Sequence, residues 1–157
     1  MIAILQRAAA ASVTVEGKVI GSIGKGLLIL LGVAEGDERA DAELLCRKIL
    51  ACRIFTDEND KMNLSVRDVD GEVLVVSNFT LLANCRRGNR PDYMGAAAPD
   101  KACDLYEYFA SLVRAELGKV ATGEFGADMR VSLEGDGPVT IVMDSNELKK
   151  TKKESRA

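Results

Sequence analysis

The sequence predicts an α+β fold: a single compact domain, built mainly from antiparallel β-sheet, with two helices packed on it. Three observations support this prediction. The 157 residues, 47% of them hydrophobic, provide enough apolar material for one core of ordinary size. Apolar runs of strand length, bounded by glycine-containing polar clusters, occur at both ends of the chain. Two other segments have the period of amphipathic helices.

The N-terminal part of the chain predicts a hairpin and then a central strand. Residues 1–8 and 12–23 are rich in apolar and β-branched side chains, around the short polar turn Glu16-Gly17-Lys18. We therefore expect two antiparallel strands here. The run from Leu27 to Val33 is continuously apolar, which is typical of a strand that is covered on both faces.

Two amphipathic helices are expected. Asp37 is in position to cap the first, which extends to Phe55 and repeats apolar side chains at Leu45, Ile49 and Cys52. The second begins at Pro99-Asp100 and ends near Gly118. Its apolar face consists of Ala102, Leu105, Phe109, Leu112 and Val113.

Between and after these helices the pattern predicts further strands. One runs from Glu72 to Val76, and two closing strands, 128–133 and 139–143, flank a turn at Gly135–Pro138. The segment from Asp144 onward is charged and lacks an apolar face, so we expect it to be disordered past about Leu148. The predicted organisation is one domain over residues 1–143 and a charged tail over residues 144–157.

The chain contains no histidine, which excludes Ser-His-Asp and Cys-His catalysis and the usual zinc ligand sets. The four cysteines form no C-x-x-C pair, and free cysteines are typical of a reducing compartment. We therefore expect no metal and no organic cofactor. The formal net charge is -3 and no long apolar stretch is present, so we expect a cytoplasmic protein without a membrane partner. No overall positive charge indicates a nucleic-acid partner, so any contact with RNA must be local.

Two short segments are candidates for chemistry. Ser77-Asn78-Phe79-Thr80 lies where an apolar strand meets a loop, a place where hydroxyls and backbone N–H groups face a ligand. In Gly135–Thr140, a Gly-Pro pair is able to hold a cis bond and to aim carbonyl groups at an ammonium group. The alternatives are ordinary turn hydrogen bonds for the first segment and a tight hairpin turn for the second.

Four arginines are further candidates for binding. Arg7, near the end of the first strand, is able to hold a loop carbonyl or to meet a phosphate, although surface arginines are common. Arg86, Arg87 and Arg90 lie in a loop rich in glycine, asparagine and proline. They either touch an RNA backbone or form a solvated face.

Together these segments resemble the D-aminoacyl-tRNA deacylase (D-tyrosyl-tRNA(Tyr) deacylase) family. Its two signatures are Ser-Gln-Phe-Thr-Leu and Asn-x-Gly-Pro-Val-Thr, which stand here as Ser77–Leu81 and Gly135–Thr140. The stretch from Ala127 to Leu133 resembles the family too, and the similarity extends to about residue 143. Asn78 and Gly135 depart from the glutamine and asparagine usual in the family.

The resemblance implies a homodimer with a barrel-like fold and aminoacyl-tRNA as the other partner, with no DNA. It implies hydrolysis of D-aminoacyl-tRNA to free tRNA and D-amino acid, and also removal of glycine mischarged on tRNA(Ala). A Gly-cisPro element of one subunit would reach the pocket of the other, hold the amino group and reject L side chains, with Arg7 bracing it. The implied site residues are Ser77, Asn78, Phe79 and Thr80 for catalysis and Gly137, Pro138, Arg7, Met129, Val139 and Thr140 for substrate binding.

The ester is already activated, so hydrolysis requires a positioned water and a site for the oxyanion. Backbone N–H groups of Phe79 and Thr80 are candidates for that site, with the terminal ribose 2′-OH as proton shuttle. Thr80 as a covalent nucleophile is a competing model, but no base is visible to activate it. Two other functions remain open, namely editing of a mischarged L-aminoacyl-tRNA and a non-catalytic module that binds RNA ends.

Overall fold

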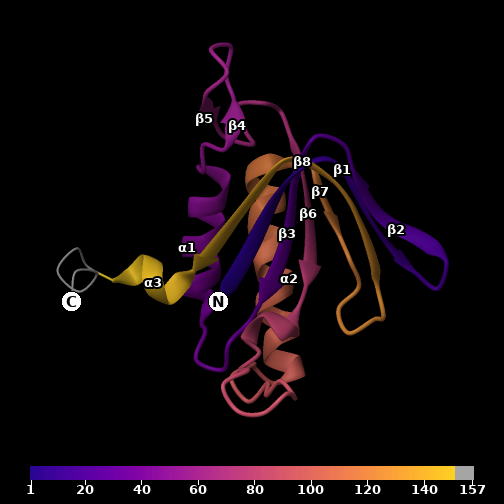
Figure 1. The fold of residues 1–157 in the computed structure, drawn as a ribbon, viewed down its shortest axis with the longest axis vertical. Coiled ribbons are helices and arrows are strands. Elements are labelled where there is room, and N and C mark those ends of the chain that lie inside the picture. The colour runs from indigo at the N-terminus through magenta and orange to yellow at the C-terminus, as the bar shows by residue number, and fades with distance from the viewer. Residues whose placement is uncertain (151–157) are drawn as a thin grey trace.

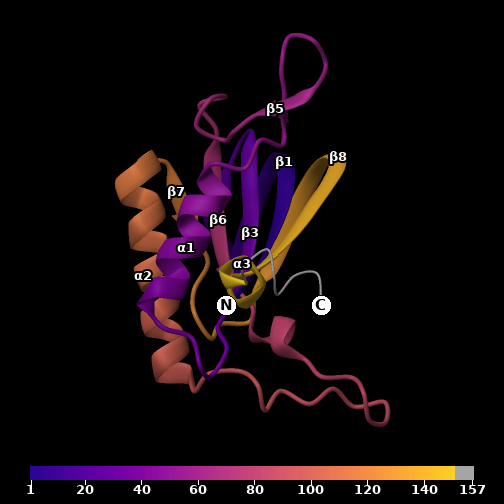
Figure 2. The same cartoon turned by 90° about the vertical axis from the view of Figure 1, so that its left-hand side faces the viewer.

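A six-stranded mixed sheet forms the centre of the computed structural model, which describes residues 1–150. The strand order is β2-β1-β3-β6-β7, and β8 pairs with the other edge of β1. Helices α1 and α2 lie side by side on one face of this sheet (Figures 1 and 2). The elements are β1 (Ile2–Val15), β2 (Lys18–Ile23), β3 (Gly26–Gly32), α1 (Arg39–Leu50), β4 (Phe55–Thr56), β5 (Met62–Leu64), β6 (Glu72–Ser77), the 3₁₀ helix η1 (Phe79–Leu82), α2 (Pro99–Leu117), β7 (Val120–Thr122), β8 (Arg130–Asp144) and α3 (Ser145–Lys149).

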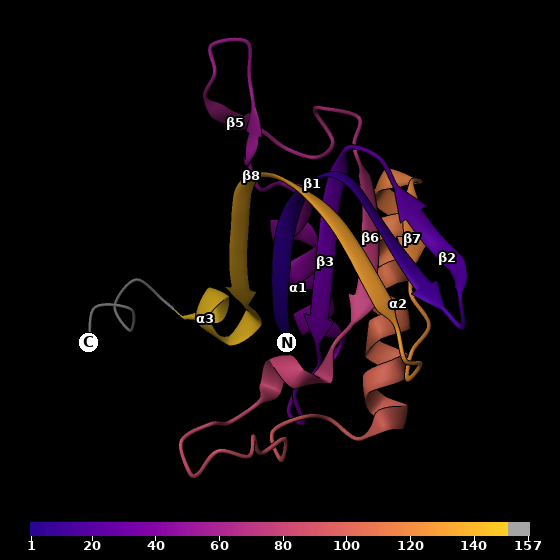
Figure 3. The same ribbon diagram turned by 45° about the vertical axis from the view of Figure 1, so that its right-hand side comes forward.

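The N-terminal hairpin is confirmed, and its first strand is longer than predicted. Glu16 and Gly17 have φ angles of 49° and 78°, the left-handed pair that a two-residue hairpin turn requires. The first half of β1 pairs with β3 and its second half pairs with β2, while β8 runs along both halves. Because β1 and β8 curve together across the molecule, the sheet is nearly closed and barrel-like (Figure 3).

The central position of β3 is also confirmed. Leu27, Ile29 and Leu31 pack in the main core beneath α1 and α2, and Leu28 packs in a second cluster on the opposite face. The predicted dominance of antiparallel pairing holds for the partners of β1, whereas β3–β6 and β6–β7 are parallel. Each parallel pair follows from a helical crossover, because α1 lies between β3 and β6 in the chain and α2 lies between β6 and β7.

The prediction of two closing strands around a turn is wrong. Residues 130–144 form one continuous strand, β8, and both of its halves pair antiparallel with β1. Thr140 pairs with Gln6 and Gly135 with Ala8, so residues 136–139 bulge out of the ladder opposite Arg7. Gly137 has a φ of 132° and proline has no N–H to donate, and neither property suits a regular ladder.

The first helix is shorter than predicted and is capped by a different residue. Glu38 precedes it, and the Glu38 N–H donates to Asp41 Oδ2 at 2.9 Å. Asp37 instead accepts a hydrogen bond from the Met1 amino group at 2.6 Å. The helix ends at Leu50, and the following residues enter the small β4–β5 hairpin.

The charged segment after Asp144 begins with the short helix α3, which the sequence did not predict, and the disorder expected past about Leu148 falls mainly on residues 151–157, which lie outside the described part of the chain. Asp144 caps α3 by accepting from Asn146 N–H at 2.8 Å. Ser145 is fully buried and its Oγ accepts from the Met1 amino group at 2.9 Å. Lys149 pairs with the buried Asp41 of α1. Leu148 also packs against the main core, so α3 is attached by these polar contacts and by one apolar side chain.

Candidate active site

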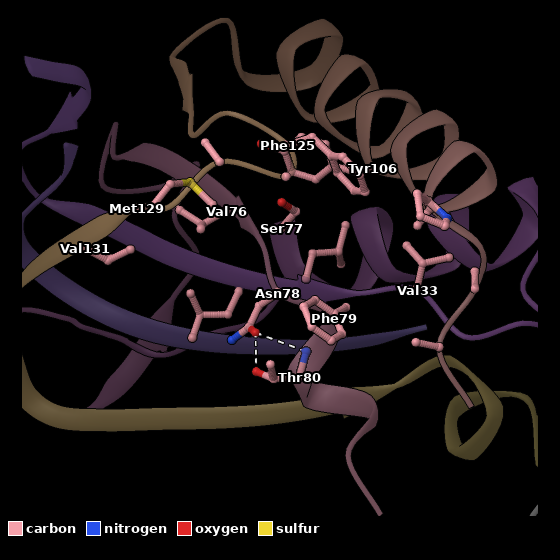
Figure 4. Close-up of a pocket in the computed structure, with 18 of the residues that line it drawn as sticks. Val33, Val76, Ser77, Asn78, Phe79, Thr80, Tyr106, Phe125, Met129 and Val131 are labelled. Atoms are coloured by element: carbon pink, nitrogen blue, oxygen red, sulfur yellow. Dashed lines mark hydrogen bonds between the residues drawn. The ribbon is translucent and has the colours of Figure 1, made fainter. Parts of the chain in front are cut away.

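A cavity of about 790 Å³ opens at the carboxyl end of β6, where the apolar strand gives way to Ser77–Thr80 (Figure 4). Its wall combines this strand end with the neighbouring end of β3, the start of α2 and the segment that leads into β8. The residues lining it are Leu30, Leu31, Val33, Val76, Ser77, Asn78, Phe79, Thr80, Ala96, Ala97, Pro99, Ala102, Tyr106, Phe125, Gly126, Ala127, Asp128, Met129 and Val131. The cavity is therefore largely apolar, with polar groups concentrated at one strand end.

Asn78 organises that strand end. Its backbone N–H donates to Leu31 O at 2.8 Å, which extends the pairing of β6 with β3 by one residue. Its side chain then caps η1, because Asn78 Oδ1 accepts from the Thr80 N–H at 3.2 Å and also from the Thr80 hydroxyl (Figure 4). The amide and the hydroxyl of Thr80 are thus both engaged by one amide oxygen.

Phe79 stands at the mouth of the cavity. Its side chain is 57% exposed, and its ring meets Tyr93 edge to face, with centroids 5.1 Å apart and planes inclined by 68°. Tyr93 belongs to the long connection between η1 and α2. The aromatic pair therefore joins this connection to the rim of the cavity.

One wall of the cavity is formed by Tyr106 and Phe125, two residues that were not among the predicted site residues (Figure 4). Their ring centroids lie 5.9 Å apart, and the Tyr106 hydroxyl donates to Val75 O at 3.0 Å. Burial raises the pKa of Tyr106 to about 12, so its phenol is neutral at pH 7 and is not a base. Tyr106 follows Leu105 on the buried side of α2. The spacing of apolar residues along this helix predicts that Tyr106 lies in the core, but it does not predict a role in a cavity.

Met129 lines the cavity together with the Ser77–Thr80 segment, but the other predicted substrate-binding residues lie elsewhere. Arg7 is 9% exposed and lies beside the bulge in β8. Its Nε donates to Asp136 O at 3.0 Å and its Nη1 donates to Ile54 O at 2.8 Å. The guanidinium thereby fastens the bulge to the segment that enters β4.

The bulge itself admits only glycine at its centre. The Gly137–Pro138 peptide bond is cis. A Cβ at Gly137 would lie 2.8 Å from Val139 N and 3.3 Å from Arg7 Nη2. Val139 packs against the main core, whereas Thr140 returns to the ladder and donates from its hydroxyl to Gln6 Oε1 at 2.6 Å. Gly137 and Pro138 remain exposed between these anchors.

Within one chain, Met129 is the one predicted substrate-binding residue that shares the cavity with Ser77–Thr80. Arg7 pairs with Leu27 near the start of β3, whereas Ser77 pairs with Leu31 near its end. Four residues of strand correspond to about 13 Å, and β1 and β3 also lie between the 136–139 bulge of β8 and β6. The Ser77–Thr80 segment would meet a Gly137–Pro138 element only if that element came from a second copy of the chain.

Residues 1–150 contain no group of three or more His, Cys, Asp or Glu side chains placed to hold a metal ion. No helix in that range is long and apolar enough to cross a membrane. The polar groups that line the cavity are hydroxyl, amide and carboxylate side-chain groups and the backbone.

Comparison with known families identifies the chain's relatives. The family model described as D-Tyr-tRNA(Tyr) deacylase matches residues 4–144. The chain belongs to this family. A D-aminoacyl-tRNA deacylase of Thermosipho melanesiensis is 55% identical over 149 residues, which are 94% of this chain and 99% of the relative. One of Pelobacter propionicus is 54% identical over 144 residues, covering 92% and 99% of the two chains.

Solved structures agree with the deacylase family fold. A structure entitled c-Myc DNA Unwinding Element Binding Protein superimposes with a TM-score of 0.87 at 40% identity, covering 92% of this chain and 98% of its own. A probable eukaryotic D-amino acid tRNA deacylase reaches a TM-score of 0.80 at 17% identity, covering 90% and 97%. The second likeness concerns the fold alone. The predicted α+β class and the predicted family are thus confirmed.

Proposed function

We propose that this deacylase family member hydrolyses the ester bond of D-aminoacyl-tRNA, which releases free tRNA and the D-amino acid. The observation that carries the proposal is the match along nearly the whole chain to relatives named for this activity, with the family's Ser77–Leu81 segment at the mouth of a large cavity. Because aminoacyl-tRNA is used in translation, the cytoplasm is the proposed location. No metal is assigned to the reaction.

Stabilisation of the oxyanion is assigned to the backbone N–H groups of Phe79 and Thr80. The Thr80 N–H is occupied by Asn78 Oδ1 at 3.2 Å, so substrate binding must turn this side-chain oxygen away and put the ester oxygen in its place. Loss of one such donor costs about 3–4 kcal/mol in related hydrolytic sites. The terminal ribose 2′-OH supplies the proton transfer for which this chain has no imidazole.

The competing nucleophile model is weaker. A threonine hydroxyl needs a neighbouring base to take its proton before it attacks. The Thr80 hydroxyl donates to Asn78 Oδ1, which is a neutral amide oxygen and is not basic enough to remove the proton. Direct attack by water is therefore the preferred mechanism.

Selectivity for the D form is assigned to Gly137–Pro138 of a second copy, which places the proposed homodimer interface beside the cavity. The separation of these residues from Ser77 within one chain supports this arrangement. Among the described residues β8 pairs only with β1, and it exposes Val131, Leu133 and Val142. A rigid wall that excludes an L side chain does not exclude glycine, so glycine mischarged on tRNA(Ala) is also a substrate.

The test is to measure ester cleavage of D-Tyr-tRNA and L-Tyr-tRNA side by side, with purified protein in chelator. Rapid loss of the D form alone supports the proposal. Loss of the L form would instead indicate an editing deacylase for L-aminoacyl-tRNA. Binding of both tRNAs without cleavage of either would indicate a module that binds RNA ends.

A further inference from the structure

We propose that the connection between η1 and α2 holds the phosphate backbone of the substrate's RNA strand near its aminoacylated end. This inference rests on the proposed function. The segment concerned, residues 84–92, is named here the arginine loop; it projects from the molecule beyond the carboxyl end of β6 (Figure 3). It carries Arg86, Arg87 and Arg90, all exposed.

These three cations are available for an external anion. Ion pairs within residues 1–150 use the Met1 amino group, Arg7, Arg67, Lys119, Lys149 and Lys150, and none involves the arginines of the loop. The loop's one acidic side chain, Asp92, accepts from the Met94 N–H at 2.8 Å. Since the whole chain has a net charge of -3, the arginine loop is a local positive surface on an acidic protein.

The base of the loop is fixed, which limits the entropy lost when it binds. Asn84 and Asp92 exchange both backbone hydrogen bonds, at 2.7 and 2.9 Å. Asn84 Oδ1 also accepts from the Arg86 N–H at 3.0 Å. A hollow of about 290 Å³ lies between Asn84, Arg86, Arg87 and Asp92. Arg86 and Arg87 therefore lie in a turn of defined conformation before any ligand binds.

The loop is placed to reach RNA whose 3′ end occupies the cavity. Tyr93, the first residue after the loop, contacts Phe79 at the cavity mouth. Arg86 follows Thr80 by six residues, so their Cα atoms lie within about 20 Å of each other even for an extended chain. An ester held at Thr80 leaves the phosphates of the last few nucleotides within this range.

The chemistry favours phosphate over a base edge as the bound group. A guanidinium presents a planar fork of N–H donors that matches two phosphate oxygens. Contacts with phosphates fix the position of an RNA strand without reading its sequence. The arginine loop therefore serves substrates that share the acceptor end and differ in the rest of the tRNA.

The experiment compares two triple variants with the unaltered protein. In the loop variant Arg86, Arg87 and Arg90 are replaced by glutamine (R86Q, R87Q, R90Q). The control variant carries K25Q, R47Q and K48Q, which remove the same charge from exposed positions outside any ion pair in the described structure. Cleavage of D-Tyr-tRNA and of D-tyrosyl-adenosine, which has no phosphate backbone, is measured across a series of salt concentrations.

For the loop variant we expect KM for D-Tyr-tRNA to rise roughly tenfold, with kcat unchanged. The salt dependence of kcat/KM should weaken by about 0.7 in log–log slope for each phosphate that the loop no longer neutralises, or about 2 for three phosphates. Cleavage of D-tyrosyl-adenosine and the behaviour of the control variant should not change.

Three results would overturn the inference: an unchanged KM for the tRNA, an equal defect on D-tyrosyl-adenosine, or an equal loss of salt dependence in the control variant. If the unaltered protein cleaves neither substrate, the proposed function fails. The salt dependence of tRNA binding by the same variants then tests the arginine loop independently.

Discussion

At the scale of single residues, the two family segments are held by different forces. Asn78 and Thr80 are arranged by side-chain hydrogen bonds at an exposed strand end, which a substrate is able to replace. The bulge around Gly137 is held by Arg7, whose Nε donates to Asp136 O at 3.0 Å, and only glycine fits at position 137, since a Cβ there would lie 2.8 Å from Val139 N. We therefore expect the Ser77–Thr80 segment to adjust on binding and the 136–139 bulge to stay rigid.

The first prediction compares Thr80→Ala with Gly137→Ala. Alanine at position 80 keeps the backbone N–H assigned to the oxyanion, so we expect kcat/KM for D-Tyr-tRNA to fall by less than about tenfold. Alanine at Gly137 must adopt a φ of 132° and displace Val139, so we expect a loss of at least about a hundredfold. Both are measured by single-turnover cleavage, with circular dichroism as the control for folding. Complete inactivity of a folded Thr80→Ala protein would instead support the nucleophile model.

The second prediction concerns Arg7 as a positioning residue. Its guanidinium donates to two carbonyl groups, Asp136 O and Ile54 O, which the single ammonium of lysine cannot hold in the same way. In Arg7→Lys we expect discrimination between D-Tyr-tRNA and L-Tyr-tRNA to fall by about tenfold or more, because the bulge loses its brace. Arg130→Lys, at an exposed position in β8, is the matched control. Discrimination that survives Arg7→Lys would show that the bulge is rigid without this residue.

At the scale of elements, the sequence pattern predicted the helices, strands and turns whose conformation depends on neighbouring residues. The Glu16-Gly17 turn, the apolar run of β3 and the glycine that ends α2 each carry their own signal, and each is present in the structure. The continuity of β8 depends on pairing with β1, and α3 depends on partners more than a hundred residues away. The strand end at Ser77 was predictable, but the Tyr106–Phe125 wall arises only when α2 docks on the sheet.

The third prediction tests the attachment of α3. Burial of Asp41 opposes its charge, but its ion pair with Lys149, the nearby Ser145 hydroxyl and the hydrogen bond from the Glu38 N–H outweigh burial and lower its pKa from 3.8 to about 2. A lowered pKa stabilises the fold above the unfolded-state value, and that stability is lost as the pH falls from about 4 towards 2. This lowering of the Asp41 pKa corresponds to about 2 kcal/mol of folding stability at neutral pH. Because the Asp41 side chain is only 2% exposed, solvent screens little of this contribution.

Urea unfolding at a series of pH values measures this contribution. In Asp41→Asn we expect a lower free energy of unfolding at neutral pH and a flatter decline between about pH 4 and 2. Asp104→Asn, at an exposed position on α2, is the matched control for removal of a carboxylate. Equal pH profiles for Asp41→Asn and the unaltered protein would show that Lys149 and Ser145 do not stabilise the Asp41 carboxylate.

At the scale of the whole molecule, the Ser77–Thr80 segment and the bulge that carries Gly137 lie at opposite ends of the sheet. The cavity opens where β6 ends, and the bulge that carries Gly137 lies beside the opposite end of β3. The outer edge of β8 is unpaired within the described chain, and Val142 on it is 66% exposed. An unpaired strand edge with apolar side chains favours association with another surface, which in the proposed homodimer is a second copy of the chain.

The last prediction is complementation between two inactive variants. Gly137→Val damages the bulge, and Ala96→Trp fills the cavity, in whose wall Ala96 lies. In a mixed dimer, the intact cavity of the first variant faces the intact bulge of the second, so one of its two sites is complete. Random reassortment of equal amounts makes half of the dimers mixed, so we expect about a quarter of the unaltered activity on D-Tyr-tRNA. The proteins are mixed after mild dissociation and reassociation, and each variant treated alone is the control. If mixed dimers form but do not restore cleavage, the cavity and the bulge of the same chain must act together, and the shared-site arrangement is wrong.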